Sequence, residues 1–426
     1  MNNIFRKLIK WWYMAFFCHR LSGSMSDKEK QLTTTSTKSQ IAKGVRRFFE
    51  KNYELRYNVL KQTEEFRRKA THRNEKATHG AEKATQWKQL TDRELRKIAI
   101  EQMEEVGVAW SIDVELYVRS AIVADYNPIT HYLQSCGEWD GYDHIRAYAR
   151  RVPTSWVHWE DCFHRWFLGM VAQWQQRSRD YGNSLVPLLI GRQGTHKSTF
   201  CKLILPPSLR EYYIDDIKLD SAEQVERMLA RMLLVNIDEY NAKTDREQAK
   251  IKRILTERDV QTRKMRSDQY VMLPRMASFV ATTNDQQPLT DPTGSRRYLC
   301  CEVDDVIDTL SPVEYTQLYA QAVHELNNGA ACYFSNQEEE EIEQHNQLFR
   351  TSSSAETILL AYFQPAPRDK EHFFLAADIL KGLKEHVSAV DMPSMKKLTM
   401  ALKTCHFPYG RVSGQRGWYA RPLQQE

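Results

Sequence analysis

The segment GRQGTHKSTF, residues 191–200, has the residue types and the spacing of a phosphate-binding loop. Glycines let backbone N–H groups turn toward phosphate oxygens, a lysine reaches the β and γ oxygens, and a hydroxyl binds Mg²⁺. Here Lys197 is the phosphate lysine, Ser198 is the metal-binding hydroxyl, and the start of the following helix favours an anion. The predicted nucleotide-binding set is Gly191, Arg192, Gln193, Gly194, Thr195, His196, Lys197, Ser198 and Thr199.

One residue of this segment departs from the usual pattern GxxxxGK[ST]. The position before the lysine holds His196, where the pattern has a glycine. A side chain narrows the backbone conformations available there. It either weakens nucleotide binding or accompanies a different loop geometry. The alternative to a nucleotide site is a chance glycine-rich turn, and the apolar run that precedes the loop counts against it.

Two acids end the next apolar segment of this kind, MLLVNIDEY, residues 232–240. Asp238 is suited to hold Mg²⁺, usually through water, and Glu239 to polarise an attacking water as general base. A strand that ends in Asp-Glu is common alone. Downstream of a phosphate loop, the pair predicts the metal and base residues of an ATP-hydrolysing site.

Two further segments add polar groups. FVATTN ends in Asn284, which could orient the lytic water, although this segment taken alone favours an ordinary Asn at a strand-to-turn junction. DPTGSRRYLC carries Arg296 and Arg297, and a guanidinium there is a candidate to reach the γ-phosphate of a neighbouring subunit. The alternative is a pair of surface arginines.

The elements that must position these residues follow from the hydrophobic pattern. Short apolar runs alternate with helical stretches from Leu185 onward, which is typical of a parallel α/β sheet. We expect strands at Leu185–Ile190, Met232–Ile237 and Ala277–Thr282, and a helix from Ser198 to Leu205. A basic hairpin, RKMRSDQYVMLP from Arg263 to Pro274, precedes the third strand.

The predicted organisation has five parts. The sequence predicts a flexible or mis-started segment at 1–40, a mostly helical region at 41–180, the α/β core at 181–305, a helical extension at 306–354 and a small α+β domain at 355–426. The last part has a helix at Phe374–Leu383, a helix at Ser394–Lys403 and a hairpin with Gly414 and Gly417 at its turns. This is the order of a winged helix, whose second helix and hairpin can touch DNA. A small helical cap with solubilising lysines is the alternative.

Composition excludes some classes of protein. The 426 residues carry a net charge of +5, too small to identify a partner, and none of the 8 cysteines has CxxC spacing. A zinc ribbon and a disulfide framework are therefore not expected, and a reducing cytoplasm is. The apolar run Ile9–Cys18 is about half the ~20 residues of a membrane span. A signal-like or interfacial segment is one interpretation of it, and a biological start at Met25 is the other.

The segment 41–75 mixes arginines with aromatic residues. Arg46, Arg47, Arg56 and Arg67 alternate with Phe48, Phe49, Tyr53 and Tyr57. Cations that meet phosphates and aromatic rings that stack on bases would suit a nucleic-acid surface. The favoured alternative is a strand or hairpin edge with solvated charges.

In order and spacing, several of these segments resemble the virulence-associated protein E family, P-loop ATPases of phages and mobile elements related to superfamily 3 helicases and primase-helicases. The segments are EWDGYDHI, GRQGTHKSTF, LLVNIDEYN, RKMRSDQYVMLPR, VATTN and DPTGSRRY, within residues 125–305. The regions on either side are similar to those of Bacteroides-type members.

The resemblance implies a P-loop NTPase core of the AAA+ or superfamily 3 helicase type, using ATP and Mg²⁺ and assembled into a homo-oligomer, expected to be a hexamer. In it Lys197, Ser198, Asp238, Glu239, Asn284 and Arg296 or Arg297 have the roles given above. Arg263, Lys264 and Arg266 of the hairpin would grip DNA phosphates in a central pore. No primase signature is visible, so a primase would be a separate chain or domain.

We therefore expect a cytoplasmic, DNA-dependent ATPase with no membrane partner, a helicase or translocase that replicates a phage or mobile element on single-stranded or forked DNA. Two alternatives remain open. One is an ATP-switched initiator or loader that binds DNA without unwinding it. The other is a non-hydrolysing scaffold, for which His196 is the main support.

Overall fold

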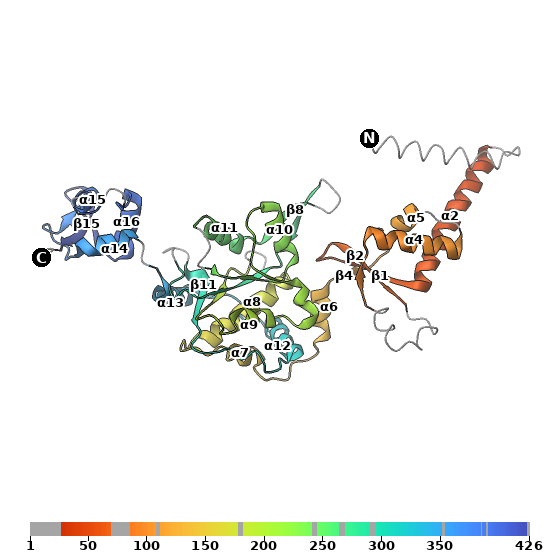
Figure 1. Cartoon of the computed structure of the whole chain (residues 1–426), viewed down its shortest axis with the longest axis horizontal. Coiled ribbons are helices and arrows are strands. Elements are labelled where there is room, and N and C mark those ends of the chain that lie inside the picture. The colour runs from red at the N-terminus through yellow and green to blue at the C-terminus, as the bar shows by residue number, and fades with distance from the viewer. Residues whose placement is uncertain are drawn as a thin grey trace. The chain divides into compact units, whose positions relative to one another are not determined.

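A computed structural model describes residues 27–69, 86–107, 111–177, 182–240, 245–263, 269–289, 295–351, 354–384, 386–388 and 391–423 (Figure 1). The chain divides into two compact units, Met1–Pro128 and Ile129–Glu426, which we describe separately. The division falls inside the region 41–180 that the sequence predicted as one mostly helical part.

The described part of the first unit combines a small sheet with three helices. The helices are α2 (Asp27–Asn52), α4 (Asp92–Val106) and α5 (Ser111–Val118). The sheet has the order β3-β2-β1-β4, from β1 (Tyr53–Asn58), β2 (Thr63–Arg68), β3 (Lys88–Gln89) and β4 (Asp125–Tyr126). Thr91 caps α4 by accepting from the Glu94 amide, and Gly107 ends it in the left-handed region at φ 77°.

Three predictions for this unit need correction. Residues 27–40 of the expected flexible segment are helical, because α2 begins at Asp27. Helices make up most of the regular structure in residues 41–180, but this region also contains a four-stranded sheet that the sequence did not predict. Phe48, Phe49 and Tyr53 are buried in its core, so their rings are not available to stack on bases. The favoured alternative, a hairpin, is confirmed by the antiparallel pairing of β1 with β2.

The second unit is built on a five-stranded parallel sheet of order β11-β5-β10-β7-β6. Its strands are β5 (Val186–Ile190), β6 (Tyr213–Asp215), β7 (Leu234–Ile237), β10 (Ser278–Thr283) and β11 (Tyr298–Glu302). The mixed α/β class and the three expected strands are confirmed. The sequence did not predict β6 or β11, because both are short: β6 has three residues and β11 has five, in which the polar Glu302 follows the apolar run Tyr298–Cys301.

Helices cover both faces of this sheet (Figure 1). On one side lie α7 (His144–Ala149), α8 (Trp159–Trp174), α9 (Lys197–Leu203) and α12 (Tyr315–Asn327); on the other lie α10 (Ala222–Arg231) and α11 (Asp245–Thr256). Every residue of β5, β7 and β10 is buried, as expected for strands sandwiched between helices. α6 (Pro128–Ser135) precedes α7.

A two-stranded hairpin, β8 (Asp259–Arg263) and β9 (Tyr270–Pro274), projects from this body in Figure 1. Arg275 follows β9 and anchors its base. The guanidinium is 1% exposed and donates to Gln173 Oε1 (3.1 Å), the Asn183 carbonyl (3.0 Å) and the Ile254 carbonyl (3.2 Å). Burial lowers its pKa to about 9. The expected hairpin therefore exists, and a buried cation ties its base to the core.

The remaining elements follow β11. After α12 come α13 (Asn336–Asn346), then α14 (Ser354–Tyr362), β12 (Phe363–Pro365), β13 (Phe373–Phe374), α15 (Ala376–Lys384), α16 (Met395–Thr404), β14 (Tyr409–Val412) and β15 (Gln415–Pro422). The expected order helix, helix, hairpin is thus present near the C-terminus. Gly414 lies at the hairpin turn with φ 85°, but Gly417 does not. It lies within β15 opposite Gly410.

Among the helices that the structure describes, none is both long enough and apolar enough to cross a membrane. The seven cysteines within the described residues are free thiols.

Gly417 is where the C-terminal part is least tolerant of a side chain. A Cβ there would lie 2.5 Å from the Phe374 carbonyl oxygen. We expect Gly417→Ala to destabilise this part by roughly 1–3 kcal/mol, because backbone must move to admit the methyl group. Amide hydrogen exchange across β15 measures the local loss, with Gln415→Ala at an exposed position of the same strand as control. Equal protection in both variants would show that β13 moves aside for the methyl group without loss of stability.

Candidate functional site

The strand order brings three strand ends together. Because β10 lies between β5 and β7, the loop after β5, the acids after β7 and the Asn after β10 share one edge of the sheet. The register places Thr283 opposite Ile190 and Ala281 opposite Ile237. The Gly191 amide donates to the Thr283 carbonyl (3.2 Å), which fixes the start of the loop beside β10.

Lys197 lies at the centre of this edge. Its side chain is buried, and Nζ donates to the Gly191 carbonyl (2.6 Å), the Arg192 carbonyl (2.9 Å) and Asn284 Oδ1 (3.0 Å). Burial lowers the pKa of the ammonium group, and the nearby charge of Asp238 opposes that shift. The structure therefore joins two predicted site residues, Lys197 and Asn284, by a direct contact.

His196 adopts the backbone conformation that the glycine of the usual pattern would supply. Its φ is 65° and its ψ is 25°, in the left-handed region, immediately before α9. Histidine is among the residues that enter this region more readily than most. Its Nδ1 lies 3.3 Å from Thr309 Oγ1, so the side chain is held away from the loop interior. The departure from the pattern therefore places a side chain at a position whose left-handed backbone favours glycine.

Asp238 and Ser198 place two oxygen atoms beside Lys197. Ser198 Oγ lies 3.5 Å from Asp238 Oδ1, and the Thr282 hydroxyl donates to the same carboxylate oxygen. Carboxylate and hydroxyl oxygens suit Mg²⁺, which also keeps several water ligands. No group of three His, Cys, Asp or Glu side chains that could hold a metal lies among the described residues.

Glu239 follows Asp238 in a strained turn. Its φ is 48°, unusual for a residue with a Cβ, and its side chain is exposed. Such conformations cost of order 1–3 kcal/mol and persist where the surrounding structure imposes them. This turn directs the two consecutive acids differently. Asp238 is part-buried against Thr282, and Glu239 faces solvent.

Arg296 and Arg297 lie at the other end of the sheet. They belong to a 3-10 turn, Ser295–Arg297, immediately before β11, and Tyr298 pairs with Val186 at the start of β5. The loop leaves the far end of β5, which at ~3.3 Å per residue is about 16 Å away. Arg296 pairs with Glu339 of α13 (3.3 Å), and Arg297 is half-buried with an Nε that has no hydrogen-bond partner among the described residues.

The side chains of the predicted DNA-contacting residues lie outside the described part of the chain. Arg263 ends β8, but its side chain, together with Lys264 and Arg266, lies outside the described residues. The two strands of the hairpin are described, and the turn between them, residues 264–268, lies outside the described residues.

Several supports of the loop were not visible in the sequence. The Ile307 amide donates to the Thr195 carbonyl (3.1 Å), which joins the segment after β11 to the loop. Three tyrosine hydroxyls satisfy carbonyls of α9 and its end: Tyr148 donates to Phe200 (2.8 Å), Tyr315 to Leu203 (2.8 Å) and Tyr319 to Ile204 (2.9 Å). These partners are distant in sequence, so no local pattern could have identified them. Thr282 lies inside the VATTN segment, yet a threonine in a strand is ordinary.

The EWDGYDHI segment connects α7 to α12 through hydrogen bonds. Asp143 caps α7 by accepting from the Arg146 amide. Gln321 of α12 accepts from the Ile145 amide (3.0 Å) and donates to Asp143 Oδ1 (2.9 Å). These contacts give the segment a structural role: it fastens the helix whose Tyr148 supports α9.

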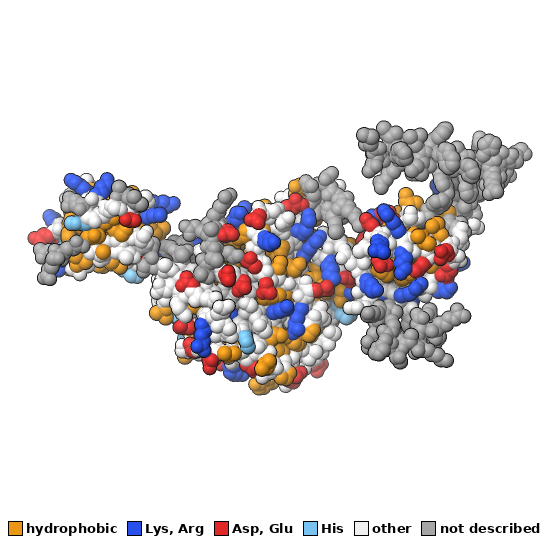
Figure 2. All heavy atoms as spheres, viewed as in Figure 1, with side chains coloured by type: hydrophobic (Ala, Val, Ile, Leu, Met, Phe, Trp, Pro, Cys, Tyr) orange, Lys and Arg blue, Asp and Glu red, His pale blue; other side chains and the backbone are white. Residues whose placement is uncertain are grey.

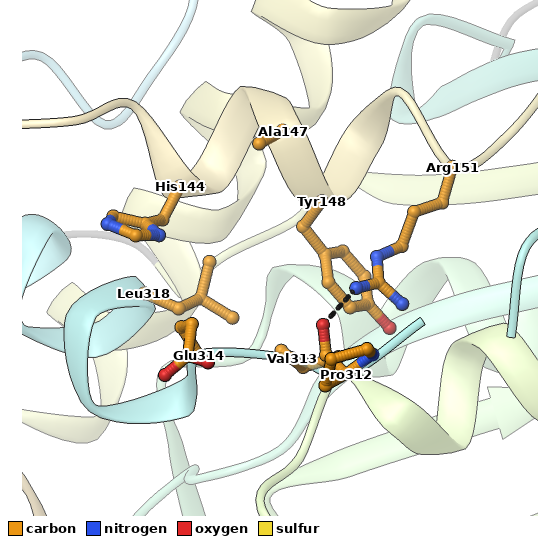
Figure 3. Close-up of a pocket in the computed structure, with 8 residues that line it drawn as sticks. All are labelled: His144, Ala147, Tyr148, Arg151, Pro312, Val313, Glu314 and Leu318. Carbon is orange, nitrogen blue, oxygen red and sulfur yellow. Dashed lines mark hydrogen bonds between the residues drawn. The ribbon is translucent and has the colours of Figure 1, made fainter. Parts of the chain in front are cut away.

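A cavity of about 120 Å³ lies between α7 and the start of α12 (Figure 3). Arg151 closes one side of it by donating to the Pro312 carbonyl (2.7 Å), and His144 and Glu314 line the other side. Its lining includes none of the predicted site residues. It shares Tyr148 with the support of α9 and is otherwise separate from the strand-end site.

The left-handed backbone at His196 can be tested by substitution. We expect His196→Gly to leave the free energy of unfolding unchanged or to raise it by up to about 1 kcal/mol, because glycine adopts this region without steric cost. His196→Val should lower it by roughly 1–2 kcal/mol, since a β-branched residue is strongly disfavoured at positive φ. Urea unfolding measures both. A glycine variant that loses more stability than the valine variant contradicts the assigned geometry.

Comparison with known proteins gives the family. Residues 133–351, just over half of the chain, match the virulence-associated protein E-like domain. No curated protein matches the chain. Similar solved structures include two apo structures of the C-terminal region of NrS-1. Each is 13% identical and covers 88% of this chain, with 97% and 98% of the other chain covered and TM-scores of 0.43 and 0.41. The match of the domain model over residues 133–351 confirms the predicted resemblance, and the chain belongs to the virulence-associated protein E-like family.

Proposed function

We propose that this chain is a DNA-dependent ATPase, a ring-forming helicase or translocase that acts in the replication of a phage or mobile element. The observation that carries the proposal is the contact of Lys197 with Asn284, beside Ser198 and Asp238. Four residues from the ends of three adjacent strands meet at one loop, and each has a role in phosphoryl transfer. Membership of the family supports the replication context.

In the proposed site the chain itself supplies phosphate binding and charge. The backbone amides of residues 191–199 and the Lys197 ammonium would hold the β- and γ-phosphates of ATP. On binding, Lys197 would exchange the Gly191 and Arg192 carbonyls for phosphate oxygens. Ser198 and Asp238 would hold Mg²⁺, directly or through water, and the ion would neutralise developing charge on the phosphates. Thr282 orients the Asp238 carboxylate for that task.

Glu239 and Asn284 would act on the attacking water. The exposed Glu239 carboxylate accepts the proton of that water as the γ-phosphorus is attacked, and Asn284 orients it. Because Asn284 accepts from Lys197, movement of the lysine onto phosphate would free the amide oxygen for water. His196 supports turnover rather than a non-hydrolysing scaffold, since its backbone matches that of the missing glycine.

The position of the arginines supports a shared site. Arg296 and Arg297 precede β11 at the end of the sheet opposite the loop, too far to reach the γ-phosphate of their own subunit. A guanidinium from a neighbouring subunit would complete the site, as in ring-shaped ATPases, and a hexamer is the proposed assembly. The β8–β9 hairpin would then face the pore with Arg263, Lys264 and Arg266 on DNA phosphates. A primase would be a separate partner.

Substitutions in the loop and the acidic pair test the proposed chemistry. Lys197→Ala should abolish measurable ATP hydrolysis, because the β and γ oxygens lose their cation. Glu239→Gln should bind ATP normally and hydrolyse it at least ~100-fold more slowly, the low end of the contribution of a general base. Phosphate release gives the rate, and equilibrium binding of a fluorescent ATP analogue gives the affinity.

The matched control is Glu226→Gln on α10, which removes a carboxylate outside the assigned site. It should leave both quantities unchanged. Full hydrolysis by Lys197→Ala would remove the assigned site altogether, whereas full hydrolysis by Glu239→Gln would remove only its base.

Mixing two inactive variants tests the shared site. Lys197→Ala has a defective loop and intact arginines, and the Arg296→Ala, Arg297→Ala double variant has the reverse. Mixed rings contain interfaces at which both halves are intact, so the mixture should recover a fraction of the wild-type ATPase rate. The readout is the rate across mixing ratios, with mass photometry confirming mixed assembly. Mixed rings that stay inactive at every ratio are incompatible with arginines acting on a neighbouring subunit.

A further inference from the structure

The last part of the chain has an unusual separation of charge. Between Ser394 and Leu423 there is no acidic residue, while the basic residues are Lys396, Lys397, Lys403, Arg411, Arg416 and Arg421. All of them are exposed. In Figure 2, blue side chains predominate over red ones on the visible surface of this C-terminal part. The preceding segment differs, because in residues 368–371 basic and acidic residues alternate as Arg-Asp-Lys-Glu.

On α16 the cations occupy the outer face. Leu398, Ala401 and Leu402 are buried and pack the helix into the core of this part. Lys396 and Lys403 lie seven residues apart, about two turns, so both fall on the same side of the helix. Ser394 caps the helix by accepting from the Lys397 amide, which fixes its first turn. The lysines therefore stand on a firmly packed helix.

The hairpin that follows carries two arginines in direct opposition. Arg411 of β14 pairs with Arg416 of β15 across the antiparallel ladder. Like charges at such positions destabilise a sheet. No ion pair joins either arginine, or any of the other four cations, to an acidic side chain within the described residues. A surface that served solubility alone would not need this unfavourable pair, nor the absence of every acid.

We propose that α16 and the β14–β15 hairpin form a second DNA-binding surface, one that takes duplex DNA through its phosphate backbone. Lys396, Lys397 and Lys403 contact phosphates from the helix, and Arg411 and Arg416 contact them from the hairpin. Phosphate charge relieves the repulsion between the two arginines. The inference rests on the proposed function only for the identity of the polyanion as DNA; it uses neither the nucleotide site nor the β8–β9 hairpin.

The arrangement of a helix followed by a hairpin favours a duplex over a single strand. A helix is 10–12 Å across, and the major groove of B-DNA is ~12 Å wide. A helix followed by a hairpin is the arrangement with which winged helices approach a duplex, as the sequence suggested. Single strands are instead bound on aromatic side chains. Here the ring of the exposed Tyr409 packs against Trp418, with ring centroids 4.7 Å apart. This ring is therefore already in contact with another aromatic side chain.

The test is binding of the full chain to a labelled 30-base-pair DNA duplex, without nucleotide, at several salt concentrations. We expect Lys396→Gln with Lys397→Gln, and separately Arg411→Gln with Arg416→Gln, to weaken binding at least tenfold. Each double variant should also lower the slope of log affinity against log salt by about 2, since each phosphate contact contributes about 0.9. Arg411→Lys with Arg416→Lys should restore most of the affinity.

The matched control is Arg368→Gln with Lys370→Gln, which removes two cations from the same part where acids alternate with them. It should change affinity less than twofold. Thermal unfolding excludes misfolding as a cause, because removing the opposed arginines should leave the melting temperature equal or higher. Equal losses in test and control variants overturn the proposal, as does tighter binding of a single strand or an RNA duplex of the same length. Since the assay needs no turnover, it is independent of the Lys197 and Glu239 experiments.

Discussion

The position of β10 between β5 and β7 is the constraint on which the candidate site depends. It places Asn284 beside the loop of residues 191–199 and Thr282 beside Asp238. Without β10 between them, β5 and β7 would have no common neighbouring strand. The loop after β5, which carries the lysine, and the acidic pair after β7 would then not be linked. Lys197 then joins the pieces, because one buried ammonium group bonds to loop carbonyls on one side and to Asn284 on the other.

That arrangement requires backbone conformations that are unfavourable on their own. His196 and Glu239 both have positive φ, one at the start of α9 and one just after β7. The surrounding structure holds them there. Thr309 contacts the His196 ring, Ile307 bonds to Thr195, and tyrosines of α7 and α12 satisfy carbonyls at the end of α9. The EWDGYDHI segment contributes indirectly, since it fastens α7 to α12.

Charge is distributed differently in the parts of the chain. In the first unit, arginines are largely compensated: Arg56 pairs with Glu65, and Arg67 with Glu54. The buried Arg275 has no carboxylate partner but is held by carbonyl and amide oxygens at the base of the β8–β9 hairpin. The cations of α16 and the last hairpin are exposed and have no ion pair with a carboxylate among the described residues, and Arg411 donates only to the Gly414 carbonyl in its own turn (2.9 Å). This exposure distinguishes them from the packed guanidinium of Arg275.

The sequence by itself determined many of the local elements and indicated which residues could carry the proposed chemistry. The spacing of Gly191, Lys197 and Ser198, the acids after an apolar strand and the alternation of strands with helices predicted an α/β protein, three strands of its sheet and the family, because these signals lie within short segments. It also suggested the final helix, helix and hairpin. Only the tertiary structure decided that Phe48, Phe49 and Tyr53 are core residues, that β6 and β11 complete the sheet, and that His196 keeps the glycine-like backbone. It also decided that Arg296 and Arg297 stand at the far end from the loop. These four findings depend on strand register and on contacts between residues far apart in the chain. Local residue spacing encodes neither the register nor the distant contacts.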